Sequence, residues 1–173
     1  MESALAAQLY AWLSGARRVA VMGVGNVLRG DDGVGSKVAR DLSNFNSERL
    51  LAVDCGDAPD AFVPEVVSFR PSHVIVVDAA DFGGDPGAVR FLSSEDMKDT
   101  SGFISTHELP LSLAVGMLRL EGGFEVAMLG IQVGQIVLGS EMSPQVRSSA
   151  ERLVGTLLDA LRSVGILEGG NVN

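Results

Sequence analysis

The chain has 173 residues, of which 46% are hydrophobic, and a mean hydropathy of +0.27. This length can bury one substantial core and is short for two, so we expect a single domain over residues 1–173. The formal net charge is −9, and no Lys/Arg cluster is longer than the pair Arg17-Arg18. Nucleic acids and anionic membranes are poor partners, because few cations are available to neutralise phosphates.

Cys55 is the only cysteine, which excludes an intramolecular disulfide and a thiolate zinc cluster and suits a reducing compartment. Residues 1–18 have an apolar middle, but Glu2 is acidic and the basic pair follows the apolar stretch, so we predict a helix rather than a signal peptide. No run approaches the ~18 apolar residues that a membrane span requires. We therefore expect a soluble, cytoplasmic protein without membrane insertion.

Predicted helices and strands alternate along the chain. Leu5, Leu9, Trp12 and Leu13 share one face of a helix ahead of the main fold. Short apolar runs then predict strands at 19–23, 50–55, 74–79, 88–92 and 125–132, the fourth of them at a sheet edge. Helical spacing predicts helices at 33–42, 61–69, 109–120 and 144–164, the third beginning at Pro110.

This alternation predicts an α/β protein with three αβα layers, in which a mostly parallel twisted sheet has helices on both faces. Such sheets bind ligands beyond the carboxyl ends of their strands. No internal repeat and no linker divides the chain. Only the polar loop 93–101 and the Gly-rich tail 168–173 are expected to be loose.

The Gly-rich segment 23–35 follows the first strand and opens a helix, where nucleotide-binding folds place a phosphate loop. It fails the dinucleotide fingerprint, because Leu28 occupies a position that requires a small residue. It also fails the phosphate-loop pattern. If the pattern starts at Gly25, Asp31 occupies the position that requires lysine, and if it starts at Gly30, Ser36-Lys37 has the reverse of the required order. Asp31 and Asp32 would repel a phosphate, so a nucleotide site is excluded here.

Two adjacent carboxylates before a helix call for separate explanations. Aspartate is a favoured N-cap residue, and the helix dipole stabilises its charge, so we assign Asp31 to the turn and to capping. Flanking glycines let the backbone approach another group closely. We therefore expect Asp32 to point into the cleft as a ligand or a base.

Asp78 and His107 are the other candidates for this cleft. Asp78 ends an apolar strand, where an unpaired carboxylate beside the buried sheet is costly without a function. His107 lies in a polar turn, 105–110, that leads into a helix after the core strands. His73, the other histidine, precedes its strand at the amino end and is expected to be structural.

Asp32, Asp78 and His107 together would supply two carboxylates and one imidazole. This donor set suits a divalent metal such as nickel or zinc, with positions left for water or a substrate atom. The same three groups could instead perform acid/base chemistry without a metal, one carboxylate remaining ionised while like-charge repulsion raises the pKa of the other. The sequence leaves both alternatives open.

Three blocks carry a resemblance to a known family: Gly23-x-Gly25-Asn26 with Asp31-Asp32-Gly33-x-Gly35, then Val76-Val77-Asp78-Ala79, then Ser105-Thr106-His107. In order and spacing the chain resembles the maturation endopeptidases of nickel-iron hydrogenases. The resemblance implies a phosphorylase/hydrolase-like αβα fold and an aspartic-type endopeptidase with Asp32 and Asp78 as catalytic residues. It also implies that Asp32, Asp78 and His107 bind nickel carried by the substrate, the hydrogenase large-subunit precursor, whose C-terminal extension is removed after nickel insertion.

One block departs from the family pattern. The family usually has a Gly-Thr-x-Pro-Glu loop after the second strand, whereas this chain has Gly56-Asp57-Ala58-Pro59-Asp60. The extra carboxylate of Asp57 is expected to alter which precursor is recognised. Cys55, beside this loop, has no histidine partner in the sequence and is expected to be a small buried residue rather than a nucleophile.

Two other functions compete with the protease. A noncatalytic nickel or peptide chaperone in hydrogenase assembly would need only the three ligands and a groove. A nucleoside-processing enzyme rests on analogy with similar three-layer folds and lacks basic residues for a phosphate co-substrate near the first loop. Turnover of a metal-loaded precursor distinguishes the protease from the chaperone.

Overall fold

The computed structural model describes residues 2–98 and 104–168. Most of the loop predicted at 93–101 is described, and it contains a short 3₁₀ turn at Asp96–Lys98. Residues 99–101 of that loop lie outside the described residues, as does the tail from 169 to 173.

Six strands form one mixed sheet in the order β2-β1-β3-β6-β4, with β5 added to β3. The strands are β1 (Val19–Val24), β2 (Leu50–Gly56), β3 (His73–Asp81), β4 (Val89–Leu92), β5 (Ile104–Ser105) and β6 (Glu125–Gln132). Neighbours among β1, β2, β3 and β6 are parallel, whereas β4 and β5 run antiparallel to β6 and β3. The predicted mostly parallel sheet is confirmed, and the strand predicted at 88–92 lies at its edge as β4.

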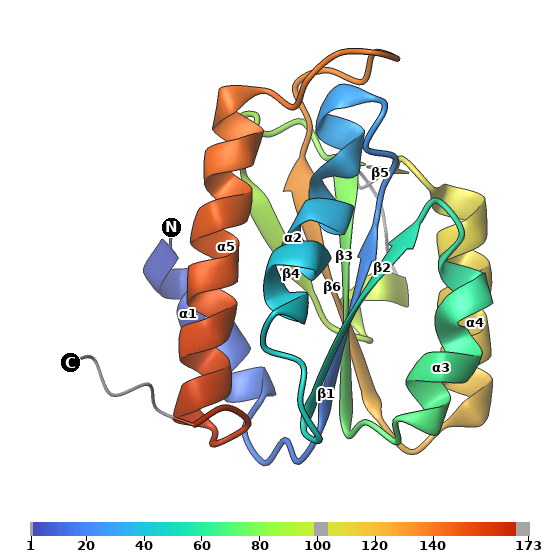
Figure 1. Cartoon of the computed structure of the whole chain (residues 1–173), viewed down its shortest axis with the longest axis vertical. Coiled ribbons are helices and arrows are strands. Elements are labelled where there is room, and N and C mark those ends of the chain that lie inside the picture. The colour runs from blue at the N-terminus through green and yellow to red at the C-terminus, as the bar shows by residue number, and fades with distance from the viewer. Residues whose placement is uncertain (1, 99–103, 169–173) are drawn as a thin grey trace.

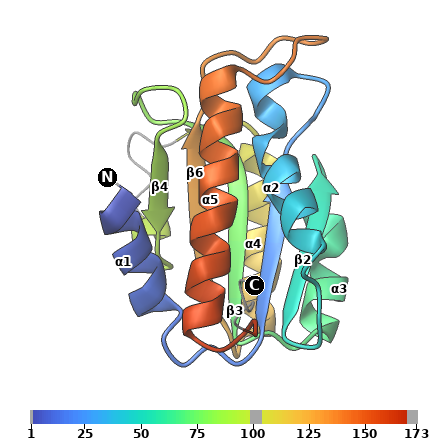
Figure 2. The same cartoon turned by 60° about the vertical axis from the view of Figure 1, so that its left-hand side comes forward.

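Helices cover both faces of this sheet (Figure 1). One layer holds α1 (Glu2–Trp12), α2 (Val34–Ser43) and α5 (Pro144–Ser163), and the other holds α3 (Val63–Ser68) and α4 (Glu108–Glu121). Figure 2 shows the sheet between the two layers. Among the described residues, no helix is long and apolar enough to cross a membrane.

The core strands are buried on both faces, which is why their sequences are continuous apolar runs. In β1, Val19 and Val21 join the cluster beneath α1, α2 and α5. Ala20 and Met22 alternate with them and join the cluster beneath α3 and α4. Two separate cores thus fix the central strands in position between the helical layers.

The sequence misplaced the bounds of two helices and missed one short strand. α4 begins at Glu108, not at Pro110, because proline is tolerated within a first turn whose N–H groups lack helical acceptors. The helix predicted at 61–69 is a 3₁₀ turn, Pro59–Phe62, followed by the short α3. β5 was not predicted, because a two-residue strand has no detectable alternation and exists only through its pairing with β3.

The helix α2 lies unusually close to the sheet. A Cβ atom on Gly35 would collide with the carbonyl oxygens of Val24 and Val77, and one on Gly23 would collide with the carbonyl oxygen of Gly35. Helix and sheet backbones therefore meet without intervening side chains. This contact sets where the segment before α2 leaves the sheet.

Replacing Gly35 by alanine is expected to lower the free energy of unfolding by about 1–3 kcal/mol, because the methyl group can fit only if backbone atoms move. The control is Gly155→Ala in α5, where a new Cβ meets nothing within 4 Å. That change should stabilise the protein by about 0.5–1 kcal/mol through helix propensity. Urea denaturation of the two variants measures both effects, and equal values for the two would contradict the close contact.

Asp31 ties the loop before α5 to the segment before α2. Its Oδ2 accepts hydrogen bonds from the backbone N–H groups of Gly134 (2.8 Å) and Gln135 (3.0 Å), and its Oδ1 accepts one from Ser143 (2.6 Å). The predicted structural role is met, but the predicted capping of its own helix is wrong, because the N-cap of α2 is Gly33. The acceptor groups face a loop more than 100 residues away in the sequence.

Asp31→Asn is expected to destabilise the protein by about 2 kcal/mol at pH 7, since hydrogen bonds to a charged acceptor are lost. Burial raises the pKa of Asp31, but the N–H donors of Ser143, Gln135 and Gly134 outweigh it and hold the pKa below 3.8. The contribution of the charge is therefore complete above pH 3.8 and is lost as the pH falls through the folded-state pKa.

Urea denaturation at pH 7 and at pH 3 measures this difference. The control is Asp41→Asn, which removes a partly exposed pair with Lys37 (2.7 Å) and should cost about 0.5 kcal/mol or less. A gap between wild type and Asp31→Asn that stays constant or widens on acidification would contradict the assignment.

Candidate active site

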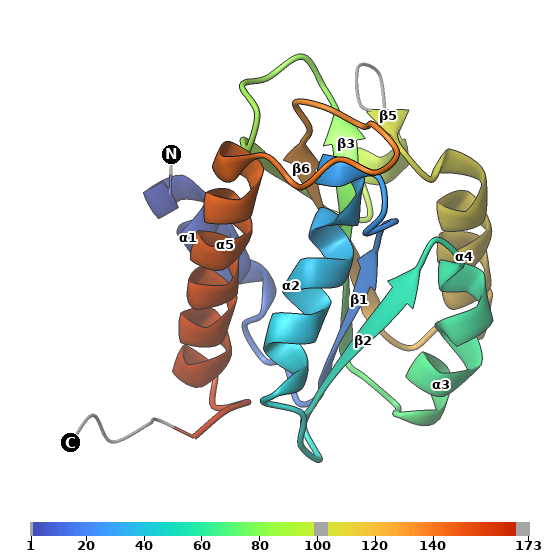
Figure 3. The same cartoon turned by 45° about the horizontal axis from the view of Figure 1, so that its top comes forward.

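Three predicted residues come together at the carboxyl ends of the central strands. Figure 3 shows this end of the sheet, where the segment before α2, the end of β3 and the start of α4 lie. Asp32 lies in the 3₁₀ turn η1 (Gly30–Gly33), which follows β1, and Asp78 lies in β3. His107 is the N-cap residue of α4. All three are buried, with 1%, 0% and 9% of their surface exposed, respectively. The sheet thus assembles residues that are 75 positions apart in the sequence.

The His107 ring stands between the two carboxylates. Its Nε2 lies 3.4 Å from Oδ2 of Asp32, and its Nδ1 lies 3.1 Å from Oδ1 of Asp78. The three side chains therefore lie in a row, with the imidazole between the two carboxylates.

His73 is not part of this row of side chains. It begins β3 at the amino end, where Nδ1 lies 3.0 Å from the Ser72 hydroxyl and the ring packs edge-on against Trp12 at 4.8 Å. Its predicted place at the opposite end of the sheet is confirmed.

Asp32 has one carboxylate oxygen that is not used. Oδ2 accepts a hydrogen bond from the backbone N–H of Asn26 at 3.2 Å, in addition to facing His107. Oδ1 is buried and has no hydrogen-bond partner among the described residues. A buried carboxylate oxygen without a partner is costly, so this atom is available to a ligand.

Asp78 has both oxygens engaged. Oδ1 faces His107, and Oδ2 accepts a hydrogen bond from the hydroxyl of Ser105. That hydroxyl in turn accepts the backbone N–H of His107 at 2.9 Å. In the sequence Ser105 stands out only as part of the motif Ser105-Thr106-His107, and its position directly before Thr106-His107 is the one signal of this role.

Thr106 indicates which ring nitrogen carries a proton. Its hydroxyl donates to the carbonyl of Ala79 at 3.1 Å, so towards Nδ1 of His107, 2.9 Å away, it can only accept. Asp78 also accepts at Nδ1. Nδ1 therefore carries a proton, and Nε2, which faces Asp32, carries the second proton when the imidazole is charged.

The three groups have shifted pKa values. Burial lowers the pKa of His107, but hydrogen bonds to Asp32 and Asp78 and their charges outweigh it and raise the pKa to about 10. Burial raises the pKa of Asp32, but the hydrogen bond to His107, the charge of that residue and the other hydrogen bonds to this carboxylate together outweigh it and hold the pKa below the usual value. The pKa of Asp78 is raised chiefly by burial, and not by the like-charge repulsion that the metal-free alternative invoked.

A row of three side chains differs from a set of metal ligands arranged around one point. Among the described residues, no group of three or more His, Cys, Asp or Glu side chains is placed to hold a metal ion. The donor atoms left to coordinate a metal ion are Oδ1 and Oδ2 of Asp32 and Nε2 of His107. Asp78 could join them only by giving up its contacts with Ser105 and with Nδ1 of His107.

Exposed apolar side chains lie on two loops at this end of the sheet. Val27 and Leu28 are 47% and 64% exposed, and Val137 and Leu138 are 56% and 74% exposed. The loops are joined by a hydrogen bond from the Gly139 N–H to the Leu28 carbonyl (2.7 Å), and Asp31 holds the second loop. Sequence patterns did not reveal this surface, because the two loops are distant in the chain.

The loop that departs from the family pattern also reaches this end. The carbonyl of Gly56 accepts the N–H of Gly25 at 2.7 Å, and Asp57 is exposed. Cys55 is buried, and burial, followed by the charges of Asp54 and Glu65, raises the pKa of its thiol to about 12. A thiol in this state is a poor nucleophile, as predicted.

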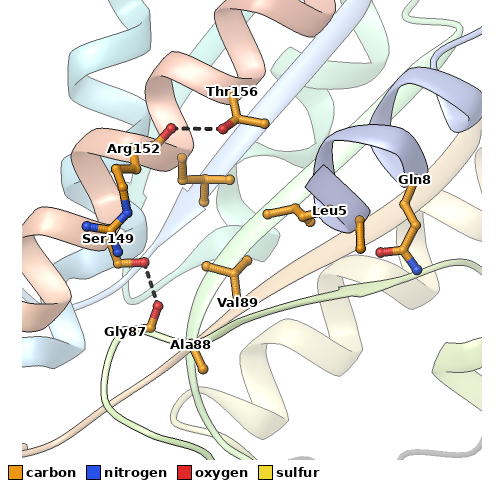
Figure 4. Close-up of a pocket in the computed structure, with 10 residues that line it drawn as sticks. Leu5, Gln8, Gly87, Ala88, Val89, Ser149, Arg152 and Thr156 are labelled. Atoms are coloured by element: carbon orange, nitrogen blue, oxygen red, sulfur yellow. Dashed lines mark hydrogen bonds between the residues drawn. The ribbon is translucent and has the colours of Figure 1, made fainter. Parts of the chain in front are cut away.

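A separate pocket of about 480 Å³ lies between α1, α5 and β4 (Figure 4). Leu5, Val89 and Leu153 give it apolar walls, and Arg152 stands at its edge. Among the described residues, no carboxylate or imidazole lines it, in contrast to the site of Asp32, Asp78 and His107.

The chain matches known proteins over most of its length. A profile of the hydrogenase maturation proteases matches residues 36–160. The hydrogenase 3 maturation protease of Escherichia coli is 30% identical over 128 residues, which cover 74% of this chain and 81% of that protein.

Solved structures agree with this match. The crystal structure of the nickel-iron hydrogenase maturation protease HycI from Thermococcus kodakarensis superposes with a TM-score of 0.80 at 31% identity, covering 90% of this chain and 99% of that one. The hydrogenase maturating endopeptidase HybD of E. coli gives 0.71 at 25% identity, covering 86% and 94%. The chain belongs to the hydrogenase maturation proteases, a family of enzymes.

Proposed function

We propose that this protein is an endopeptidase that removes the C-terminal extension of a nickel-iron hydrogenase large-subunit precursor after nickel insertion. The observation that carries the proposal is the buried Asp32–His107 pair, which has a free carboxylate oxygen and lies at the end of the sheet that bears the exposed apolar loops. The names of the relatives, one of them a maturation protease for hydrogenase 3, support the same class of substrate.

Nickel belongs to the substrate in this proposal. Oδ2 of Asp32 and Nε2 of His107 lie 3.4 Å apart, which is a spacing that two donors on one divalent ion adopt when each bond is about 2.1 Å. Asp78 faces Nδ1 of the same ring, as carboxylates do behind metal-binding histidines. Asp32 and His107 thus contact the nickel directly, and Asp78 orients the histidine and becomes a third ligand if its contact with Nδ1 opens.

The same contacts provide a route to hydrolysis. Asp32 stays ionised because its pKa is lowered, and its free Oδ1 can accept a proton from a water that attacks the scissile carbonyl. Nickel held by the precursor would fix that peptide beside Asp32 and polarise the carbonyl. A precursor without nickel lacks the bridge between the two proteins and is left uncut.

The four exposed apolar side chains Val27, Leu28, Val137 and Leu138 support binding of a peptide segment beside the pair. The cytoplasm is the proposed location, because the single cysteine, Cys55, is a free thiol that needs no oxidising compartment.

Incubation of the purified protein with nickel-loaded and nickel-free large-subunit precursor, followed by intact-mass analysis, tests the proposal. Loss of a C-terminal peptide only from the nickel-loaded precursor is expected. Nickel-dependent binding without cleavage would instead identify a noncatalytic chaperone. Cleavage at the same rate with and without nickel would refute the role of the metal as a recognition signal.

Substitutions at the three residues are expected to abolish processing. Asp32→Ala and His107→Ala remove the donors to nickel, and Asp78→Asn removes the charge behind the imidazole, so cleavage rates should fall by about 10²–10⁴-fold. Circular dichroism and urea denaturation check that each variant is folded. Glu108→Gln, an exposed neighbour of His107, is the control and should cleave at the wild-type rate. Retained cleavage in all three variants would refute the site.

A further inference from the structure

Ser105 connects the two ends of the contact between Asp78 and His107. Its hydroxyl donates to Oδ2 of Asp78 and accepts the backbone N–H of His107 at 2.9 Å. The ring of His107 completes a closed loop, because Nδ1 lies 3.1 Å from Oδ1 of the same carboxyl group. One hydroxyl therefore holds both the carboxyl group and the backbone from which the imidazole projects.

The position of Ser105 is set by main-chain pairing with the strand that carries Asp78. Ser105 lies opposite Ala80 in the antiparallel pairing of β5 with β3. The next residue, Thr106, binds the carbonyl of Ala79 through both its N–H and its hydroxyl, each at 3.1 Å. The hydroxyl of Ser105 is thus delivered to Asp78 by the backbone and does not depend on His107.

Removing this hydroxyl would leave two buried groups without partners. Oδ2 of Asp78 is on a side chain with 0% exposure, so it has no ready access to bulk water. The N–H of His107 would lose its acceptor at the N-cap of α4. Both groups would have to find new partners, and the simplest change is a turn of the carboxyl group and the imidazole about their side-chain torsions.

We propose that Ser105 is a positioning residue, whose hydroxyl locks Asp78 and the His107 backbone so that Nε2 of His107 faces Asp32. For its kinetic test this inference rests on the proposed protease function. The hydroxyl of Ser105 is taken up by Asp78 and the N–H of His107, so in this proposal its effect is on how often the imidazole stands in the productive orientation.

The kinetic test compares Ser105→Ala, Ser105→Thr and wild type on nickel-loaded precursor. Ser105→Ala is expected to lower kcat by about 10- to 100-fold, the range found for partners that orient metal-binding histidines. Ser105→Thr retains the hydroxyl and should recover most of the loss. The control is Ser43→Ala, which removes a hydroxyl that caps a carbonyl at the end of α2 (2.7 Å). Urea denaturation checks that each variant is folded.

A second readout does not require cleavage. The chain has two histidines, so the imidazole C–H signals of His107 can be assigned by NMR, with His73 as an internal reference. Ser105→Ala is expected to shift and broaden the His107 signals while the His73 signals remain in place. Wild-type and Ser105→Thr spectra should agree at His107.

The two readouts separate the two proposals. A Ser105→Ala variant that cleaves within twofold of wild type, or whose His107 signals match those of wild type, would overturn the positioning role. A wild-type protein that cleaves no nickel-loaded precursor would refute the proposed function instead. In that case the NMR comparison still decides whether Ser105 fixes the imidazole.

Discussion

The structure depends on the direct backbone contact between α2 and the sheet. Gly23 and Gly35 have no side chains at the crossing, so the helix lies against the carbonyl oxygens of β1 and β3. The turn between β1 and α2 is consequently drawn over the carboxyl end of β3. Asp32, within that turn, reaches His107, whose ring also contacts Asp78 of β3. A longer side chain at position 35 would push this turn outward and open the pair.

Two adjacent aspartates have opposite roles because of the groups that face them. Asp31 is surrounded by backbone N–H donors, so its charge is fully used in holding the loop before α5. Asp32 faces an imidazole and retains a free buried oxygen. The first carboxylate therefore stabilises the framework, and the second is left reactive beside the exposed apolar loops.

The row formed by Asp32, His107 and Asp78 determines which donor atoms could take up a cation. With Nδ1 occupied by Asp78 and Thr106, Nε2 of His107 and the carboxylate of Asp32 are left facing each other. Two acceptors at that distance repel unless a proton or a metal lies between them. Under the function proposed above, the two donors are in place before the nickel of the precursor arrives, and that ion would take the place of the Nε2 proton.

The sequence by itself determined the αβα architecture, because continuous apolar runs alternating with amphipathic helices can be buried only as a sheet between helical layers. It also indicated Asp32, Asp78 and His107 as candidates, because Asp78 ends a buried strand, Asp32 lies in a Gly-flanked turn before a helix, and His107 lies in a polar turn before another helix. Only the tertiary structure decided that the three side chains lie in a row with the imidazole in the middle. Ser105, the partners of Asp31 and the apolar loops were likewise beyond the sequence, because hydrogen-bond partners and surface neighbours are set by where distant segments meet, which no local pattern records.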